Sequence, residues 1–293
     1  MAAAMADESA GRVSVESGVV FGTGGGRELR GDVFRPPAGS ANGAGVLLIH
    51  GGGWEHGDRT QLKGYGILLG RIGYTCVACE YRLSGEAQWP AQLHDVKAAL
   101  RWMRANAEHL RIDPSRVAVS GNSAGGHLSL MLAATPNMAE FEGSGGHAGV
   151  GTDVAASVAF YAPTNLGASR PASESVEPTI TPPPRMLPDV VSRLLGADAP
   201  VGRVRGASPI TYVRADFPPT LLISGNRDVV VPADESTRMY RALMAAGARA
   251  ELHVYEGAPH AFDALPAFGR QCAAIVALFL DRHVVNPRPV ALP

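Results

Sequence analysis

The stretch around Ser123 constrains the fold of this chain more than any other part of the sequence. A short apolar run leads into the letters G-N-S-A-G-G at 121–126, and a second apolar stretch follows at 127–134. This order predicts a strand, a sharp turn and a helix, with Ser123 at the apex of the turn. Glycines two residues before and after the serine remove side chains that would collide there. Ser123 is therefore a candidate nucleophile, and the N–H of Ala124 would point toward a developing oxyanion.

The same letters also have a purely structural explanation. With 35 glycines in 293 residues, a G-x-S-x-G match also arises by chance. A Gly-rich turn with a serine that caps the next helix would look identical. The choice between a nucleophile and a capped turn therefore depends on the rest of the chain.

Strand-like and helix-like segments alternate on both sides of this turn. Three short segments within 13–34 predict antiparallel strands at a sheet edge. The alternation predicts an alpha/beta fold, with a mostly parallel central sheet flanked by helices. Apolar runs predict further strands at 46–49, 74–81, 117–120, 154–161 and 219–225, and an alternating segment predicts one at 250–255. Amphipathic periodicity predicts helices at 61–72, 90–103, 189–195, 234–246 and 267–283.

The domain organisation follows from length and composition. We expect a frayed tail at 1–11 and a single domain over 12–293. A polar, Pro-rich stretch at about 163–205 interrupts the alternation and is too short to hold a core of its own, which predicts an insertion. Its amphipathic segment is either a lid or a helix packed on the sheet. As a lid it would present an apolar face to the active-site mouth, formed by Met186, Leu187, Val190, Val191, Leu194 and Leu195, with Leu187 and Val191 as candidate substrate contacts.

Charge and cysteine content limit the classes of partner. The net charge of −1, without long runs of one sign, gives no support to nucleic acid or anionic membranes as partners. Cys76, Cys79 and Cys272 form no disulfide framework and are expected to be buried thiols. We expect no metal and no cofactor. No apolar run approaches the roughly 20 residues of a membrane helix, and the start lacks signal-peptide features, so the expected location is cytoplasmic. A homo-oligomer is left open.

Two further polar side chains directly follow predicted strands. Asp228 comes after the strand at 219–225 and His260 after the strand at 250–255. Active sites in parallel sheets lie at these strand ends. A histidine can take and return the serine proton, and a carboxylate on its far nitrogen fixes the tautomer. Asp234 is expected to cap the following helix instead, and Asp263 lies too close to His260 in sequence to be its usual partner.

A glycine motif, H-G-G-G-W at 50–54, follows the buried strand at 46–49. Glycines there would let backbone N–H groups approach a substrate carbonyl. A phosphate loop is a poor alternative because no Gly-Lys-Ser/Thr ending follows. Trp54 and Trp89 are candidates for lining the substrate pocket, with a core role as the alternative for each.

Together these motifs resemble the hormone-sensitive-lipase-like branch of the alpha/beta-hydrolases, and especially its small carboxylesterases. The resemblance covers about residues 30–283. It implies Ser123 as nucleophile with Asp228 and His260 as its partners. It also implies the N–H groups of Gly52, Gly53 and Ala124 as the oxyanion hole. The motifs are H-G-G-G-W at 50–54, E-Y-R-L at 80–83, G-N-S-A-G-G-H-L at 121–128, G-N-R-D at 225–228 and G-A-P-H-A-F at 257–262.

Two departures from the family pattern bear on the substrate. Asn122 stands where many members carry an acidic residue, and the N-terminal region lacks the long helical cap of lipase-like members. Both point toward acetyl- and feruloyl-ester hydrolases and arylformamidase-like enzymes. We therefore expect a serine carboxylesterase for short-chain or small aromatic esters. An arylformamidase-like amide hydrolase is the alternative, and a non-catalytic receptor is the third interpretation.

Overall fold

The computed structural model describes residues 11–167 and 187–288. The expected tail at 1–11 therefore lies, apart from its last residue, outside the described residues. The same holds for the middle of the expected insertion. Among the residues described, no helix has the length and apolar character needed to cross a bilayer.

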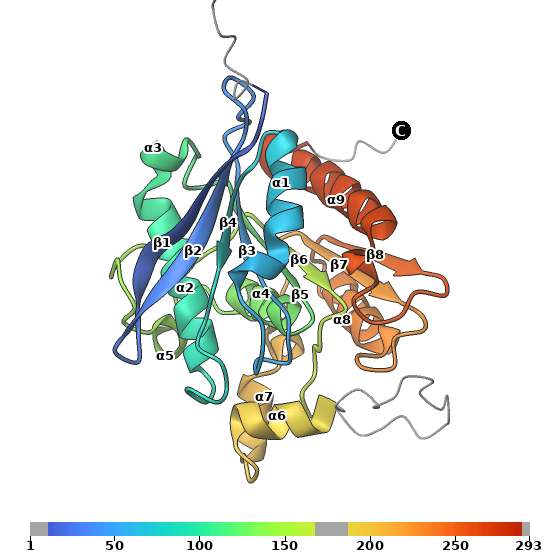
Figure 1. Cartoon of the computed structure of the whole chain (residues 1–293). Helices are drawn as coiled ribbons and strands as arrows, with labels where there is room; N and C mark the ends of the chain where they lie inside the picture. Colours follow the sequence, from blue (N-terminus) through green and yellow to red (C-terminus); the bar gives the residue numbers. More distant parts are fainter. Residues whose placement is uncertain (1–10, 168–186, 289–293) are drawn as a thin grey trace, which may run out of the picture.

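A sheet of eight strands runs through the molecule in the order β1-β2-β4-β3-β5-β6-β7-β8 (Figure 1). The pairs β1–β2 and β2–β4 are antiparallel, and every later pair is parallel. The predicted mostly parallel sheet with an antiparallel edge is confirmed. The strands are β1 (Ser14–Gly24), β2 (Arg27–Arg35), β3 (Gly45–Ile49), β4 (Thr75–Cys79), β5 (Val117–Asn122), β6 (Ala156–Phe160), β7 (Thr220–Gly225) and β8 (Ala250–Tyr255).

Helices cover both faces of the sheet and close two separate apolar cores. Helices α1 and α9 bury apolar side chains in the core on one face, and α2, α4 and α8 do so on the other. The strands β3 to β7 are buried along their length, as expected for a sheet covered on both faces. The helices are α1 (Lys63–Arg71), α2 (Ala91–Ala105), α3 (Ala107–Leu110), α4 (Ala124–Ala134), α5 (Ala139–Glu142), α6 (Leu187–Leu195), α7 (Val201–Gly206), α8 (Ala233–Ala245) and α9 (Pro266–Leu280).

Several local details differ from the sequence-based expectations. The two segments expected at 13–15 and 19–21 form the single strand β1, whose register shifts between Glu16 and Val19. The short helices α3, α5 and α7 were not predicted, because one or two turns are too short to show an apolar period. Asp234 does not cap α8. The cap position is Pro232, and Asp234 lies exposed in the first turn.

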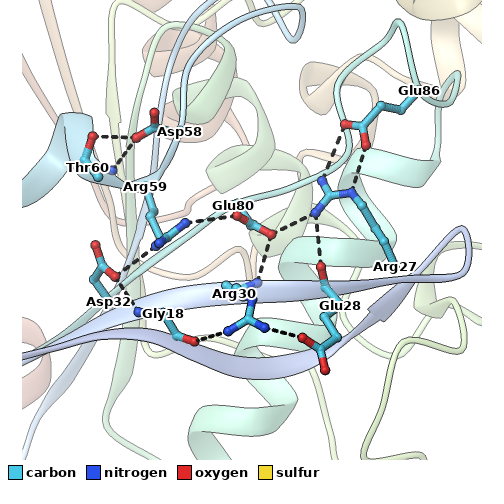
Figure 2. A network of polar contacts seen from close by, with 10 residues as sticks. All are labelled: Gly18, Arg27, Glu28, Arg30, Asp32, Asp58, Arg59, Thr60, Glu80 and Glu86. Carbon is cyan, nitrogen blue, oxygen red and sulfur yellow. Dashed lines mark hydrogen bonds and ion pairs between the residues drawn. The ribbon is translucent and has the colours of Figure 1, made fainter.

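A network of ion pairs joins the antiparallel edge of the sheet to the segment that follows the glycine motif (Figure 2). Arg59, in the 3-10 turn η1 (Arg59–Leu62), donates to Asp32 of β2 at 2.9 Å and to Glu80 at 3.2 Å. Arg27 of β2 also pairs with Glu80, at 2.8 Å. Asp58 accepts the N–H of Thr60 and so caps η1. The end of the loop that follows the glycine motif is thereby tied to the antiparallel edge of the sheet.

The predicted insertion contains α6 and α7, which lie together at one end of the molecule (Figure 1). Leu194 and Leu195 of α6 are fully buried, and Val190 and Val191 are nearly so. The carbonyl of Leu194 accepts the N–H of Trp89 at 3.0 Å. Helix α6 is thus packed onto the body of the protein through its apolar side.

Candidate active site

Ser123 occupies a strained turn between β5 and α4. Its backbone has φ 54° and ψ −117°, a positive φ that is costly for a residue with a side chain. Its N–H donates to the carbonyl of Phe160 at 2.8 Å, which holds the turn against β6. A Cβ at position 125 would lie only 2.0 Å from the carbonyl oxygen of Ile49. The turn therefore requires glycine there, and the neighbouring strand β3 enforces the geometry.

The structure brings the three residues of the predicted triad together from three different strand ends. Nε2 of His260 lies 3.0 Å from Oγ of Ser123. Nδ1 of the same ring lies 2.6 Å from Oδ2 of Asp228. Both distances are within hydrogen-bond range, so the imidazole bridges the hydroxyl and the carboxylate. A serine, a base and an orienting acid in this arrangement can carry out nucleophilic acyl transfer.

Asp228 is held by the backbone that follows it. Its side chain is fully buried, and Oδ1 accepts the N–H groups of Val230 and Val231, both at 2.8 Å. Oδ2 is left for His260. Backbone donors to one carboxylate oxygen fix the direction of the other oxygen.

The loops that carry the acid and the base are joined directly. Asn226 accepts the N–H of Gly257 on its side-chain oxygen at 2.8 Å, and Arg227 donates its N–H to Ala258 at 3.0 Å. Sequence reasoning passed over Asn226, although its place between the β7 strand and Asp228 was a usable signal. Its amide links the ends of β7 and β8.

The glycine motif reaches the site with two N–H groups free to bind a ligand. Gly52 and Gly53 have φ values of 112° and 63°, which turn the peptide planes out of the strand direction. Within residues 11–167 and 187–288 neither N–H donates to an acceptor. The N–H of Ala124, the first residue of α4, has no partner within its own helix. These are the three predicted oxyanion donors, and each lines the cavity that contains Ser123.

His50 has a packing role in the glycine motif rather than a role in proton transfer. Its ring stacks on Tyr81 with centroids 4.3 Å apart, and Tyr81 donates its hydroxyl to the carbonyl of His50 at 3.0 Å. Burial lowers the pKa of His50. Packing of the neutral, buried His50 ring on Tyr81 explains why a histidine begins H-G-G-G-W and a tyrosine stands in E-Y-R-L.

A cavity of about 990 Å³ opens above Ser123 and His260. Trp54, with a positive φ of 60°, borders this cavity, and its buried ring also packs edge-on against His127 in the core. Trp89 does not border the cavity, and its ring packs against His127 and Phe141.

Of the α6 residues named from the sequence, some border the cavity and others are buried in the core. Val191 is buried against the core and does not line the cavity, whereas its neighbour Val190 does. The side chain of Leu187 lies outside the described residues. Arg193 pairs with Glu55, directly after the glycine motif. Helix α6 therefore contributes one wall of the cavity while being packed on the core.

Asp263 forms a buried contact that the sequence did not predict. Its carboxylate accepts Nδ2 of Asn122 at 2.6 Å and the hydroxyl of Tyr161. Burial and this carboxylate raise the pKa of Tyr161 well above its usual value. The ring of Tyr161 also meets His260 edge-on at 4.6 Å. A carboxylate from η3 (Phe262–Ala264) thus lies against the side chain of Asn122, next to Ser123.

No metal centre is evident in this part of the molecule. Among the described residues no group of three or more His, Cys, Asp or Glu side chains could hold an ion. All three cysteines are buried free thiols.

The strand order, the strained serine and the bridging histidine define an alpha/beta-hydrolase. Residues 31–243 match the BD-FAE family model, and the chain belongs to that family. The resemblance predicted from the motifs is confirmed.

Named relatives and solved structures agree with this assignment. The chain is 33% identical to esterase LipC of Mycobacterium tuberculosis, over 81% of this chain and 58% of the relative. It is 32% identical to the probable carboxylic ester hydrolase LipM of the same organism, over 87% and 57%. The chain thus spans about three fifths of the length of these relatives. A truncated carbohydrate esterase from gut microbiota superimposes with a TM-score of 0.81 at 26% identity, covering 94% of this chain and 98% of that one.

Proposed function

We propose that this chain is a serine carboxylesterase that hydrolyses carboxylic esters of small molecules through a covalent acyl-enzyme. The observation that carries the proposal is the position of His260, between Oγ of Ser123 at 3.0 Å and the buried carboxylate of Asp228 at 2.6 Å. The esterase names of the relatives and of the carbohydrate-esterase structure support the reaction class.

In the first half-reaction, Oγ of Ser123 attacks the ester carbonyl carbon while Nε2 of His260 takes the hydroxyl proton. The carbonyl oxygen becomes an oxyanion, which the N–H groups of Gly52, Gly53 and Ala124 stabilise. Each donor of this kind is worth about 3 kcal/mol in the transition state. Collapse of the intermediate breaks the bond to the alkoxy oxygen, and His260 returns the proton to the leaving alcohol.

In the second half-reaction, a water molecule takes the place of the alcohol. His260 removes its proton, the hydroxyl oxygen attacks the acyl carbon, and the bond to Ser123 breaks. The carboxylic acid leaves and Ser123 recovers its proton. Asp228 stabilises the imidazolium in both halves and keeps Nε2 directed at the serine.

The expected substrates are short-chain or small aromatic esters. Val190, Trp54 and the glycine motif form the wall next to Ser123, and together they favour a compact acyl or aromatic group at the reacting carbonyl. We treat residues 12–293 as one catalytic domain, with the insertion at 163–205 contributing this wall.

Hydrolysis of p-nitrophenyl acetate and butyrate tests the proposal. The parent chain should turn over both esters, and Ser123→Ala should lose nearly all activity while keeping its unfolding midpoint. Equal turnover by the variant would contradict the role of Ser123. Mass analysis after treatment with an organophosphonate should show one label, on Ser123. A chain that neither turns over esters nor takes the label would be a binding protein on this fold.

Substrate competition separates ester from amide hydrolysis. The value of kcat/KM for a simple ester should exceed that for N-formylkynurenine. The reverse order would replace the esterase assignment with the arylformamidase alternative.

A further inference from the structure

The catalytic cavity is larger than a short ester requires. Its volume of about 990 Å³ lies at the upper end of the roughly 300–1,000 Å³ typical of small-molecule sites. An acetyl or butyryl group at Ser123 would leave most of this space unfilled. The unused part runs away from Ser123, between α1 and the start of α9, two helices that lie side by side (Figure 1).

One face of α1 lines this extension. Gly64, Ile67, Leu68 and Arg71 all border the cavity, and their spacing places them on a single side of the helix. A Cβ at Gly64 would meet nothing within 4 Å, so the space above this face is open. Seven residues of helix separate Gly64 from Arg71, a rise of about 10 Å. We refer to this part of the cavity as the α1–α9 groove.

The α1–α9 groove is apolar near the site and cationic farther out. Pro266 and Gly269 of α9 line the wall opposite α1, and Arg270 follows them. Neither the Arg71 nor the Arg270 guanidinium group has a hydrogen bond or ion pair with any of the described residues, and both side chains are exposed. Arg71 ends α1, where a cation is favourable to the helix dipole. Arg270 is the fifth residue of α9, so that explanation does not apply to it.

The acidic side chains that line the same cavity are already neutralised or bonded. Glu55 pairs with Arg193, and Asp263 accepts Asn122 and Tyr161. The two arginines are therefore the charges available to a ligand in the groove. Guanidinium groups bind carboxylates and other oxyanions in two-pronged geometry.

From these observations we propose that the substrates carry a long apolar arm that ends in an anionic group, bound by Arg71 and Arg270. This inference rests on the proposed esterase function and revises its substrate class, from short-chain esters to esters in which one side carries a long anionic arm. The arm would lie along Ile67, Leu68 and Pro266, with its carboxylate at the outer end of the α1–α9 groove. The anionic arm belongs either to the acyl part or to the alcohol part of the ester, and two matched substrate series distinguish these sources.

The acyl series compares p-nitrophenyl hydrogen suberate with p-nitrophenyl octanoate, which has the same chain length without the carboxylate. The alcohol series compares the acetate ester of omega-hydroxyoctanoate with octyl acetate. In one series the anionic ester should have a kcat/KM about tenfold higher than its neutral partner, as expected for two partly exposed ion pairs. This preference should vanish when ionic strength rises from about 0.01 M to about 1 M, because the Debye length falls from about 30 Å to about 3 Å.

The arginines are tested as a pair. In a chain carrying R71Q and R270Q, the ratio of anionic to neutral turnover should fall to about one, and R71K with R270K should largely restore it. R241Q, an exposed arginine of α8 outside the cavity, is the matched control and should keep the parent ratio. A ratio near one in the parent chain, or a parent-like ratio in the glutamine variant, would overturn the proposal.

A binding measurement keeps the test independent of catalysis. Calorimetry on Ser123→Ala should show about tenfold tighter binding of monomethyl suberate than of methyl octanoate, and the difference should disappear when R71Q and R270Q are added. If the parent chain hydrolyses neither series but this binding holds, the esterase function fails and the anion site stands. If neutral esters are hydrolysed and no binding difference is found, the anion site fails alone.

Discussion

Replacing Asp228 with asparagine should disable the candidate triad without disturbing the fold. The reason lies in the two backbone N–H groups that meet Oδ1 at 2.8 Å. Only an acceptor satisfies those donors, so in D228N the amide oxygen takes the Oδ1 position. The amide NH₂ then takes the position of Oδ2, which lies 2.6 Å from Nδ1 of His260.

A donor at that position reverses the tautomer of the imidazole. Nδ1 must accept a hydrogen bond, so the ring proton moves to Nε2 and faces Oγ of Ser123. The base is then protonated on the wrong nitrogen. A triad histidine fixed in the wrong tautomer loses about 10⁴-fold in kcat, which corresponds to about 5 kcal/mol in the activation barrier.

Steady-state hydrolysis of p-nitrophenyl acetate, with kcat and KM determined separately, measures this loss. KM should change little, since Asp228 is buried behind His260 and does not line the cavity. The matched control is D234N, at an exposed acid six residues farther along the chain, which should keep parent activity. A kcat of D228N within tenfold of the parent would refute the tautomer argument, and a large loss in D234N would reassign the acid.

Three further predictions concern the surrounding structure. Leu194→Ala should lower the free energy of unfolding by about 2–5 kcal/mol in a urea titration, because this α6 side chain is fully buried; a loss below about 1 kcal/mol would mean that α6 opens as a lid. Gly125→Ala should cost at least about 3 kcal/mol of stability, or abolish phosphonate labelling of Ser123, since its Cβ would meet the carbonyl of Ile49 at 2.0 Å; a folded, fully labelled variant would contradict this packing. Burial lowers the pKa of His127 to about 4, below the 6.5 of an unfolded histidine, so stability should be lost as pH falls from about 6.5 to 4, by at most about 3 kcal/mol. His127→Gln should remove that part of the pH dependence, and an unchanged profile of unfolding free energy against pH would count against it.

The parts of the fold and site that could be predicted from the sequence are those set by local pattern. Ser123, Asp228 and His260 each follow a strand of the parallel part of the sheet within five residues, so the topology alone brings them to one edge. The glycines of H-G-G-G-W and G-N-S-A-G-G stand where the backbone has a positive φ or approaches another backbone closely. The residues beside them in the sequence are enough to indicate such turns.

The rest depends on contacts between distant residues. Asn122 and Asp263 are 141 positions apart, and nothing near either one in the sequence points to the other. Trp89 and Trp54 looked equally suited to a pocket. Both rings pack against His127 in the core, and only Trp54 also borders the cavity. Whether Val190 or Val191 borders the cavity depends on how α6 is rotated about its axis. The burial of Leu194 and Leu195 fixes that rotation, and Val190 then borders the cavity.

The buried cysteines have a practical consequence for studying motion in this protein. Cys76, Cys79 and Cys272 are its only cysteines, all of them free and buried, and burial raises the pKa of each thiol, that of Cys272 to about 11. Such thiols are poor nucleophiles at neutral pH. A single cysteine introduced on the exposed side of α6 would therefore react with maleimide dyes ahead of the native ones. A fluorophore attached there would report directly whether this helix shifts when an ester enters the cavity, without removing any native residue.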